Sequence, residues 1–419
     1  MHHASRFSAL LVYVSITVLA HASVTGADRS LLVMTRPHAD IAAFKERLAG
    51  RSLIVLRDVH CEKYGYAIFQ VRPNRGDANA ALESLHSSKD ADLAVAEPTF
   101  DSGLAGCVPD IDDPGFNEQW NLESLNFDEM RCLLESHGVI QKTQPRVTLI
   151  DSGILAIKKE MNKSRIRAFN FVGGAGGVEE DVFVDGYSNR HGTAVASIAA
   201  AMTNNGKFLA SPASCDKPVT ITMCRVAENN DIATMDVLEA MTWCVDNQTI
   251  RGGPGVINMS VQSFGLPTFN GSSVVQEIAK SAYKQGDLFV NAAGNENLND
   301  PSSVTKHFRV ITGLDDTEMR WDDEDVGSNY GAYKAAAPCT EIPCLAPSAK
   351  AAFSIYHGTG TSFAAPSWAS SIALLMSLKP NLSAPKADKI IFKTARKTAE
   401  GYRIPDLRDA VNKVLELEP

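Results

Sequence analysis

The chain has 419 residues, of which 44% are hydrophobic and 21% are charged, and its formal net charge is -9. A globular chain of this length and composition can form one large core and one smaller domain. The negative charge gives no general basic field for nucleic acid or for an anionic membrane surface, so we expect no nucleic-acid partner.

Residues 1–22 have the pattern of a secretory signal peptide. A weakly basic start, MHHASRF, precedes the apolar stretch SALLVYVSITVLA and a small-residue cleavage pattern that ends at Ala22. The apolar stretch is too short to span a bilayer comfortably, and no other stretch approaches about 20 apolar residues. We therefore expect a secreted protein, either extracellular or stored in a secretory-pathway vesicle, with no membrane span in its mature form. An N-terminal membrane anchor is the alternative.

A small domain of β-α-β-β-α-β order is predicted next. The patterns predict a strand at 30–35, a helix at 40–50, strands at 52–59 and 64–71, a helix at 77–88 and a strand at 91–98. This order is that of a ferredoxin-like module. The loop DSGLAGCVPDIDDPG follows it and is rich in Asp, Gly and Pro. We therefore predict one domain over residues 28–105 and a second over residues 110–419.

The second domain is predicted to be α/β, a parallel sheet with helices on both faces. Short β-rich apolar runs begin at residues 146, 219, 255, 288 and 308, helical patterns begin at 191, 235 and 274, and a last apolar helix starts at Ser362. Alternation of this kind indicates a parallel sheet. Functional residues of such sheets gather in the loops beyond the carboxyl ends of the strands.

Three polar side chains at element ends point to acyl-transfer chemistry. Asp151 ends the apolar run VTLI, His191 opens the helical segment HGTAVASIAAA, and Ser362 precedes an apolar helix. Each has an ordinary interpretation when taken alone: a turn or capping Asp, a His at a helix start, an N-cap Ser. Together they supply a nucleophilic hydroxyl, a base that takes its proton and a carboxylate that orients the base.

Asn295 adds a fourth group. It leaves the apolar run LFVN through Ala-Gly. Its side-chain amide and the backbone N–H of Ser362 at a helix start are two donors for the oxyanion of a tetrahedral intermediate.

These motifs resemble those of subtilisin-like serine proteases, the subtilase family. VTLIDSGI resembles the aspartate motif, HGTAVASIAA the histidine motif, NAAGNEN the oxyanion-asparagine motif and GTSFAAP the serine motif. SNYGAYKAAAP resembles the segment before the serine, and the chain order Asp, His, Ser is that of subtilisin. A lipase or esterase would show G-x-S-x-G and the order Ser, Asp, His, and neither is present.

The resemblance implies a monomeric serine endopeptidase that hydrolyses peptide bonds of protein or peptide substrates and needs no catalytic cofactor. Asp151, His191, Ser362 and Asn295 would be its catalytic residues. The module at 28–105 resembles the family's inhibitory propeptide, so the chain would be a zymogen that cuts itself between Phe100 and Asp113. A subtilase fold kept as an inactive secreted binding protein is the competing interpretation.

The resemblance also implies substrate-binding residues. VINMSVQSFG is similar to the edge strand that pairs with the substrate backbone through Ser260, Val261 and Gln262. Ala293 and Gly294 would lie on the opposite side. The family usually has glycine where Gln262 falls. A side chain there would narrow access to the peptide, or an inserted loop would shift the register.

Subtilases commonly carry structural calcium, which takes several oxygen ligands. The resemblance places candidate ligands at Asp113, Glu160 and Asn204. The loop TNNG is shorter than the family usually has, which removes expected backbone ligands.

Cysteines and sequons give further expectations for a secreted chain. The eight cysteines favour disulfides, and the short separation of Cys339 and Cys344 allows a local loop; buried free thiols at Cys224 and Cys244 are the alternative. Glycosylation sequons lie at Asn162, Asn247, Asn258, Asn270 and Asn381. Asn270, in a polar loop, is the favoured acceptor, and Asn258 lies inside an apolar strand.

Overall fold

The computed structural model describes residues 31–61, 66–73, 78–98, 110–181, 183–262, 269–300, 307–323, 325–347 and 352–416. The chain divides into two compact units, Met1–Asp101 and Ser102–Pro419. The predicted signal peptide and most of the predicted cleavage segment between Phe100 and Asp113 lie outside the described residues, as does Cys107.

The first unit is a four-stranded antiparallel sheet with two helices. Its elements are β1 Leu31–Thr35, α1 Ile41–Gly50, β2 Leu53–Cys61, β3 Tyr66–Pro73, α2 Ala78–His86 and β4 Leu93–Pro98. The strand order is β2-β3-β1-β4, and each neighbouring pair is antiparallel. Alternate residues of β1, Leu31 and Val33, pack with Phe44 and Leu48 of α1 in one core. The β-α-β-β-α-β order is the one that the sequence predicts.

The second unit is built on an eight-stranded sheet of order β16-β13-β12-β11-β5-β8-β6-β7. The strands are β5 Arg146–Asp151, β6 Ile166–Asn170, β7 Val178–Glu179, β8 Thr220–Arg225, β11 Val256–Met259, β12 Leu288–Ala292, β13 Phe308–Leu314 and β16 Ala336–Pro338. All neighbouring pairs are parallel except β6 and β7. This mostly parallel sheet confirms the predicted α/β class.

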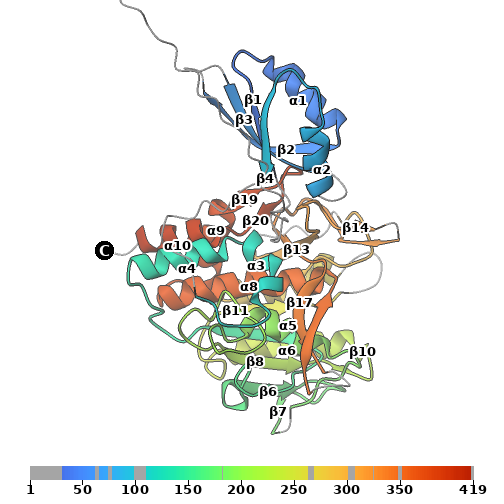
Figure 1. Ribbon diagram of the computed structural model, residues 1–419. Helices are drawn as coiled ribbons and strands as arrows, with labels where there is room; N and C mark the ends of the chain where they lie inside the picture. Colours follow the sequence, from blue (N-terminus) through green and yellow to red (C-terminus); the bar gives the residue numbers. More distant parts are fainter. Residues whose placement is uncertain are drawn as a thin grey trace, which may run out of the picture. The chain divides into compact units, whose positions relative to one another are not determined.

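The remaining elements are helices and short strand pairs (Figure 1). The helices are α3 Trp120–Ser124, α4 Phe127–Ser136, α5 His191–Ala200, α6 Thr234–Asp246, α7 Ser273–Lys284, α8 Thr361–Leu378, α9 Ala384–Thr394 and α10 Leu407–Glu416. The strand pairs are β9 Ala227–Glu228 with β10 Asp231–Ile232, β14 Asp322–Asp323 with β15 Val326–Gly327, β17 Ile342–Ala346 with β18 Ser354–Gly358, and β19 Arg396–Lys397 with β20 Arg403–Ile404.

Two hydrophobic cores cover the two faces of this sheet. Val147 and Leu149 of β5 belong to the core that holds α5 and α8, whereas Ile150 belongs to the core that holds α6 and α7. Side chains that alternate along a strand point to opposite faces. The central strands are therefore apolar on both sides, which explains why they appear in the sequence as continuous apolar runs.

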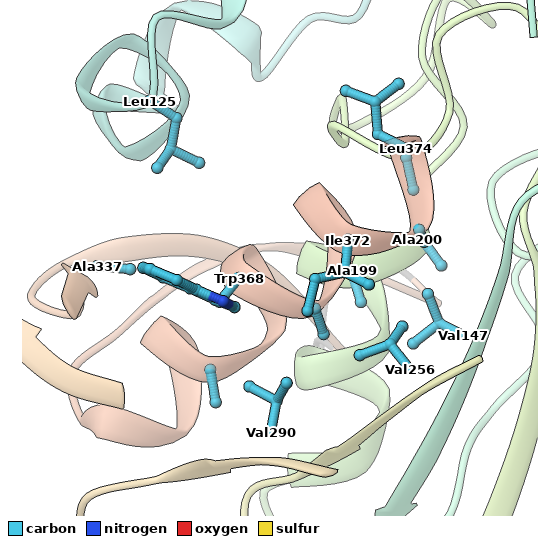
Figure 2. Packing of buried hydrophobic residues seen from close by; sticks show 14 of the residues in the cluster. Leu125, Val147, Ala199, Ala200, Val256, Val290, Ala337, Trp368, Ile372 and Leu374 are labelled. Carbon is cyan, nitrogen blue, oxygen red and sulfur yellow. The ribbon is translucent and has the colours of Figure 1, made fainter. Parts of the chain in front are cut away.

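Helix α8 lies in the middle of the larger core and is buried on nearly all sides. Figure 2 shows Ile372 of α8 beside Ala199 of α5 and Trp368 of α8 beside Ala337, with Val256 and Val290 of the strands below. Trp368 is fully buried, and its indole N–H donates to Asp388 over 2.9 Å. Within the described residues, no helix combines the length and the apolar character that a membrane crossing needs.

Candidate active site

Asp151 and His191 meet at one edge of the sheet. Asp151 is the last residue of β5 and His191 the first residue of α5. Asp151 Oδ1 lies 2.8 Å from His191 Nδ1 and accepts the Ser152 backbone N–H over 2.7 Å. The Asp151 side chain is 3% exposed, and that of His191 is 21% exposed. A buried carboxylate thus holds one ring nitrogen of an imidazole that remains open to solvent.

A second buried carboxylate fixes the start of α5. Asp185 accepts the backbone N–H of Thr193 over 2.8 Å, its hydroxyl over 2.7 Å, and the Ser152 hydroxyl over 2.6 Å. Ser152 Oγ in turn accepts the Gly192 N–H over 2.8 Å. Arg190, at the N-cap position, has left-handed backbone and makes no side-chain cap. Asp185 and Ser152 therefore take the place of an N-cap side chain and connect β5 to the helix that carries His191.

The charges around His191 favour its protonated form. Burial of the imidazole works in the opposite direction, but the charge of Asp151, the hydrogen bond to Asp151 and the charge of Asp185 outweigh it and raise the pKa of His191. Asp151 is therefore placed to stabilise an imidazolium.

Asn295 lies against the start of α8. Its Oδ1 accepts the backbone N–H and the hydroxyl of Thr361, each over 2.9 Å. The Thr361 hydroxyl accepts the Gly294 N–H over 3.0 Å. These contacts fix which end of the Asn295 amide is the oxygen. Among the described residues, Asn295 Nδ2 has no acceptor within hydrogen-bond distance, so its N–H groups can donate to a bound molecule.

Ser362 is the second residue of α8 and lies between two anchored neighbours. Thr361 is held by Asn295, and the Phe363 ring centroid lies 6.0 Å from that of His191. The backbone carbonyl of Ser362 accepts the Ser260 hydroxyl over 3.0 Å. Pro366, four residues on, has no N–H to donate to this carbonyl, which frees it for Ser260. The proline is the sixth residue of the helix and therefore lies beyond its first turn.

The predicted substrate strand follows β11 and is anchored through Val261. The backbone N–H and carbonyl of Val261 are bonded to the side chain of Asn291, at 3.4 and 3.0 Å. The backbones of Ser260 and Gln262, on either side, are therefore the ones oriented for another strand. Ala293 and Gly294 follow the neighbouring strand β12 and lead directly to Asn295. The structure thus brings all five predicted substrate-binding residues to the edge that holds Asp151.

The predicted calcium ligands lie in a hydrogen-bonded cluster with the loop 203–209. Asp113 accepts the backbone N–H groups of Asn204 and Asn205, at 2.8 and 3.1 Å. Glu160 accepts the Asn205 amide over 2.8 Å and the Leu209 N–H over 3.0 Å. Burial raises the pKa of Glu160 to about 7 and also raises that of Asp113.

These residues do not form an oxygen cage for calcium in the geometry described. Each oxygen of Asp113 and Glu160 accepts an N–H group. Asn204 directs its side-chain oxygen to the Asp112 N–H, and Asn205 rather than Asn204 reaches Glu160. The buried Oδ1 of Asn205 has no partner among the described residues, and an ion would need the Asn205 amide to turn over.

The general expectation of disulfides holds at Cys132, which is disulfide-bonded. Two narrower expectations for a secreted chain, a local Cys339–Cys344 loop and a glycan at Asn270, are wrong. Cys339 and Cys344 are buried free cysteines, so they form no local disulfide loop. Cys224 and Cys244 are also free, with their sulfurs 3.7 Å apart. Asn270 is fully buried and donates to the Ala292 carbonyl over 3.0 Å, so it cannot carry a glycan.

The residues that support the site were not predictable from the sequence. The contacts that place these residues in the site join segments that are distant in the sequence. Asp185 binds Ser152 and Thr193, and Thr361 binds Asn295. Asp185 stands in VFVDGYSNRHG, where Asp-Gly reads as a turn. Ser152 lies inside the motif VTLIDSGI and Thr361 inside GTSFAAP, but their spacing in the sequence does not indicate which residues they bind.

The Subtilase family model matches residues 142–410 of this chain. Subtilisin DY of Bacillus licheniformis is 27% identical over 265 residues, which cover 61% of this chain and 85% of that protein. Thermitase of Thermoactinomyces vulgaris is 29% identical over 269 residues, which cover 63% of this chain and 85% of that protein. The matched part contains the whole eight-stranded sheet.

A solved structure of a protease from Pseudoalteromonas arctica is similar in fold, with a TM-score of 0.60 at 24% identity. The likeness covers 73% of this chain and 99% of that structure. At this identity it bears on the fold alone, and the fold agrees with that of the matched family.

Proposed function

This chain belongs to the subtilase family of serine endopeptidases, and from that membership we propose that it is a secreted zymogen that processes itself. The observation that carries the catalytic part is the 2.8 Å hydrogen bond between the buried Asp151 and the solvent-facing His191. It is the contact that an acyl-transfer triad needs between its carboxylate and its base.

In this proposal, Ser362 Oγ attacks the carbonyl carbon of the scissile bond and His191 takes the hydroxyl proton. The carbonyl oxygen becomes an oxyanion that accepts hydrogen bonds from Asn295 Nδ2 and the Ser362 backbone N–H. The C–N bond breaks as His191 gives its proton to the leaving amine, which leaves an ester on Ser362. Water then attacks the ester carbon and gives a proton to His191. The bond between Ser362 Oγ and the acyl carbon breaks as His191 returns this proton to Oγ, which releases the acid product.

The unit before residue 101 is the proposed inhibitory propeptide. It has a sheet and a core of its own, and it precedes the family match. We place the self-cleavage between Phe100 and Asp113. The signal peptide at 1–22 and a monomeric mature enzyme belong to the same proposal. A glycan, where the secretory route adds one, goes to the exposed Asn381.

One experiment tests the proposal on the full chain. The wild type and Ser362→Ala are expressed, followed by mass spectrometry over time, and incubated with a fluorophosphonate probe. We expect the wild type to split between residues 100 and 113 and to label, and Ser362→Ala to stay intact and unlabelled. A folded wild type that neither splits nor labels would instead support the inactive binding protein.

A further inference from the structure

The residue whose carbonyl is attacked, here called the acyl-side residue, is confined between two segments. The proposed oxyanion donor Asn295 ends one of them, 293–295, and the proposed substrate strand 260–262 forms the other. Because Asn291 holds the backbone of Val261, the backbones of Ser260 and Gln262 are the ones directed to the substrate. The side chain of the acyl-side residue therefore has to fit between Gln262 and Gly294.

Gln262 already crosses this gap. Its Nε2 donates to the Ala293 carbonyl over 2.6 Å, which joins the substrate strand to the opposite segment. Its Oε1 accepts the Phe269 backbone N–H over 3.0 Å. Both ends of the carboxamide are thus anchored, and the methylenes of the side chain lie between the two segments.

The space over Gly294 is filled from three sides. A Cβ atom added to Gly294 would lie 2.9 Å from Gln262 Cγ, 2.7 Å from Glu296 Oε2 and 2.3 Å from Asn329 Nδ2. Asn329 Nδ2 also donates to Glu296 Oε2 over 2.6 Å and to the Ala293 carbonyl over 3.2 Å. No room for a large side chain remains directly above Gly294 while these residues keep their positions.

The charge of Glu296 does not make the gap a site for basic residues. Its carboxylate accepts the Asn329 amide over 2.6 Å and itself occupies the space beside Gly294, so a long basic side chain has no room to lie against it there. The Gln262 amide that closes the gap is neutral, and it uses its donor and its acceptor on the protein itself. The gap therefore selects by size rather than by charge.

We propose that Gln262 makes this protease selective for glycine, alanine or serine as the acyl-side residue of its substrates. This specificity rests on the proposed function, because it needs Ser362 to attack beside Asn295. A leucine, phenylalanine or lysine has to displace the Gln262 carboxamide from both of its partners, whereas a methyl or hydroxymethyl group fits beside it.

The test uses four peptide p-nitroanilides that differ only in the residue before the anilide: Ala, Leu, Phe or Lys. Each is assayed with the self-processed wild type, Gln262→Gly and Gln262→Met, and active sites are counted with the fluorophosphonate probe. Methionine keeps the bulk of the side chain but loses both hydrogen bonds. Gln262→Met therefore distinguishes the effect of side-chain volume from the effect of the hydrogen bonds to Ala293 and Phe269.

For the wild type we expect kcat/KM for Ala to exceed that for Leu, Phe and Lys by about tenfold or more, the discrimination that a filled pocket typically gives. Gln262→Gly should raise kcat/KM for Leu and Phe relative to Ala by a similar factor. Gln262→Met should keep part of the wild-type preference.

Two results would overturn the inference. One is a wild type that labels at Ser362 yet cleaves the Leu or Phe peptide as well as the Ala peptide. The other is a Gln262→Gly enzyme that labels fully and keeps the wild-type ratios. Both leave the proposed function standing. A wild type that neither labels nor cleaves any peptide removes the proposed function, and this specificity with it.

Discussion

The two ends of the Asn295 amide have different partners: Oδ1 accepts the Thr361 N–H and hydroxyl, whereas Nδ2 has no acceptor among the described residues. Nδ2 is therefore the end that would donate to the oxyanion in the proposed mechanism, and the role of this donor can be tested separately. We expect Asn295→Ala to lower kcat by about 10²–10³, the typical cost of one oxyanion donor. Steady-state kinetics on a peptide p-nitroanilide measure this loss.

Asn295→Asp is the matched variant for this prediction. It keeps an oxygen for Thr361 but replaces the donor with a second acceptor. It should therefore fold normally and lose at least as much kcat as Asn295→Ala. If Asn295→Asp retains the wild-type rate, Asn295 supports Thr361 and is not an oxyanion donor.

Asp185 should influence His191 through its charge. A subtilase His acts as a base only when neutral, so activity falls as the pH decreases through the pKa of His191. Because Asp151 and Asp185 raise that pKa, the acid limb should lie above the ordinary value of about 6.5 for histidine. Asp185→Asn removes one of the charges and should move the acid limb of kcat/KM to lower pH, by less than about one unit.

Asp236→Asn is the control for this variant. Asp236 is also buried and accepts the backbone N–H groups of Gly173 and Gly174, at 2.8 and 3.2 Å. Each variant should cost about 1–2 kcal/mol of unfolding free energy, because a buried acceptor is lost. Only Asp185→Asn should change the pH profile, and equal profiles would restrict Asp185 to a structural role.

At the scale of residues, the sequence predicts those that lie in a recognisable motif. It does not predict the residues that tertiary contacts bring beside them. Asp151 and His191 were predictable because acyl transfer needs a carboxylate and an imidazole, and both lie at element ends. Asp185 was not, because its contacts with Ser152 and Thr193 depend on how a loop folds back. Asn270 was misjudged for the same reason: a polar loop sequence does not reveal that the fold buries it.

At the scale of elements, the loop 203–209 offers a test of calcium binding. Because Asn204 turns its side-chain oxygen to the Asp112 N–H and Asn205 presents an N–H rather than an oxygen to Glu160, Asp113 and Glu160 lack the further oxygen ligands that calcium needs, and we expect no calcium stabilisation. A site filled at 100 times its Kd would add about 2.7 kcal/mol, or roughly 5–10 °C to the unfolding temperature. Calorimetry of Ser362→Ala, which avoids self-digestion, should give equal midpoints in EDTA and in excess CaCl2.

Magnesium serves as the control for general ionic effects. A rise in the midpoint with calcium alone would contradict the expectation. It would mean that the Asn205 amide turns over and brings its buried oxygen beside Glu160. Asn205→Ala should then remove the effect.

The start of α8 near Ser362 was predictable because small residues precede an apolar run, but Gly360 rather than Ser362 takes the N-cap position. The role of Pro366 was not predictable. Its position in the helix interior leaves the Ser362 carbonyl without a helical donor, and only the fold brings the Ser260 hydroxyl to that carbonyl.

At the scale of the whole molecule, the reactivity of the cysteines toward an alkylating reagent tests the fold. Cys215, Cys224, Cys244, Cys339 and Cys344 are buried and free. Burial raises the pKa of Cys215 and Cys344 to about 12, so little thiolate forms there at neutral pH. Native Ser362→Ala protein should resist alkylation at these five positions, and all five should react in denaturant without reductant. Peptide mapping by mass spectrometry reads this out.

Cys224 and Cys244 are the pair to examine in that experiment. A disulfide has its sulfurs about 2 Å apart, whereas these lie 3.7 Å apart. Recovery of a peptide that links Cys224 to Cys244 from unreduced protein would contradict the prediction.

The α/β class was predictable from the alternation of apolar strands and helices, because strands buried on both faces of a parallel sheet read as apolar runs. The strand order β16-β13-β12-β11-β5-β8-β6-β7 was not, since it depends on pairings between distant segments. The secretory pattern predicts disulfides in general, and Cys132 is disulfide-bonded. The local loop that the spacing of Cys339 and Cys344 allows is not formed. The sequence does not reveal that Cys339 and Cys344 are packed in the core, where a free thiol behaves as a small apolar side chain.

The order of the proposed catalytic residues along the chain sets when, during synthesis, the active site can assemble. Asp151 and His191 lie on β5 and α5, but Ser362 lies on α8, more than 200 residues after Asp151. Helix α8 is buried in the core that also holds α5 and the central strands, so it inserts only after they have been made. On the proposed roles, a chain still emerging from the ribosome would hold the base His191 without the nucleophile Ser362, so we expect cleavage to begin only when folding is nearly finished.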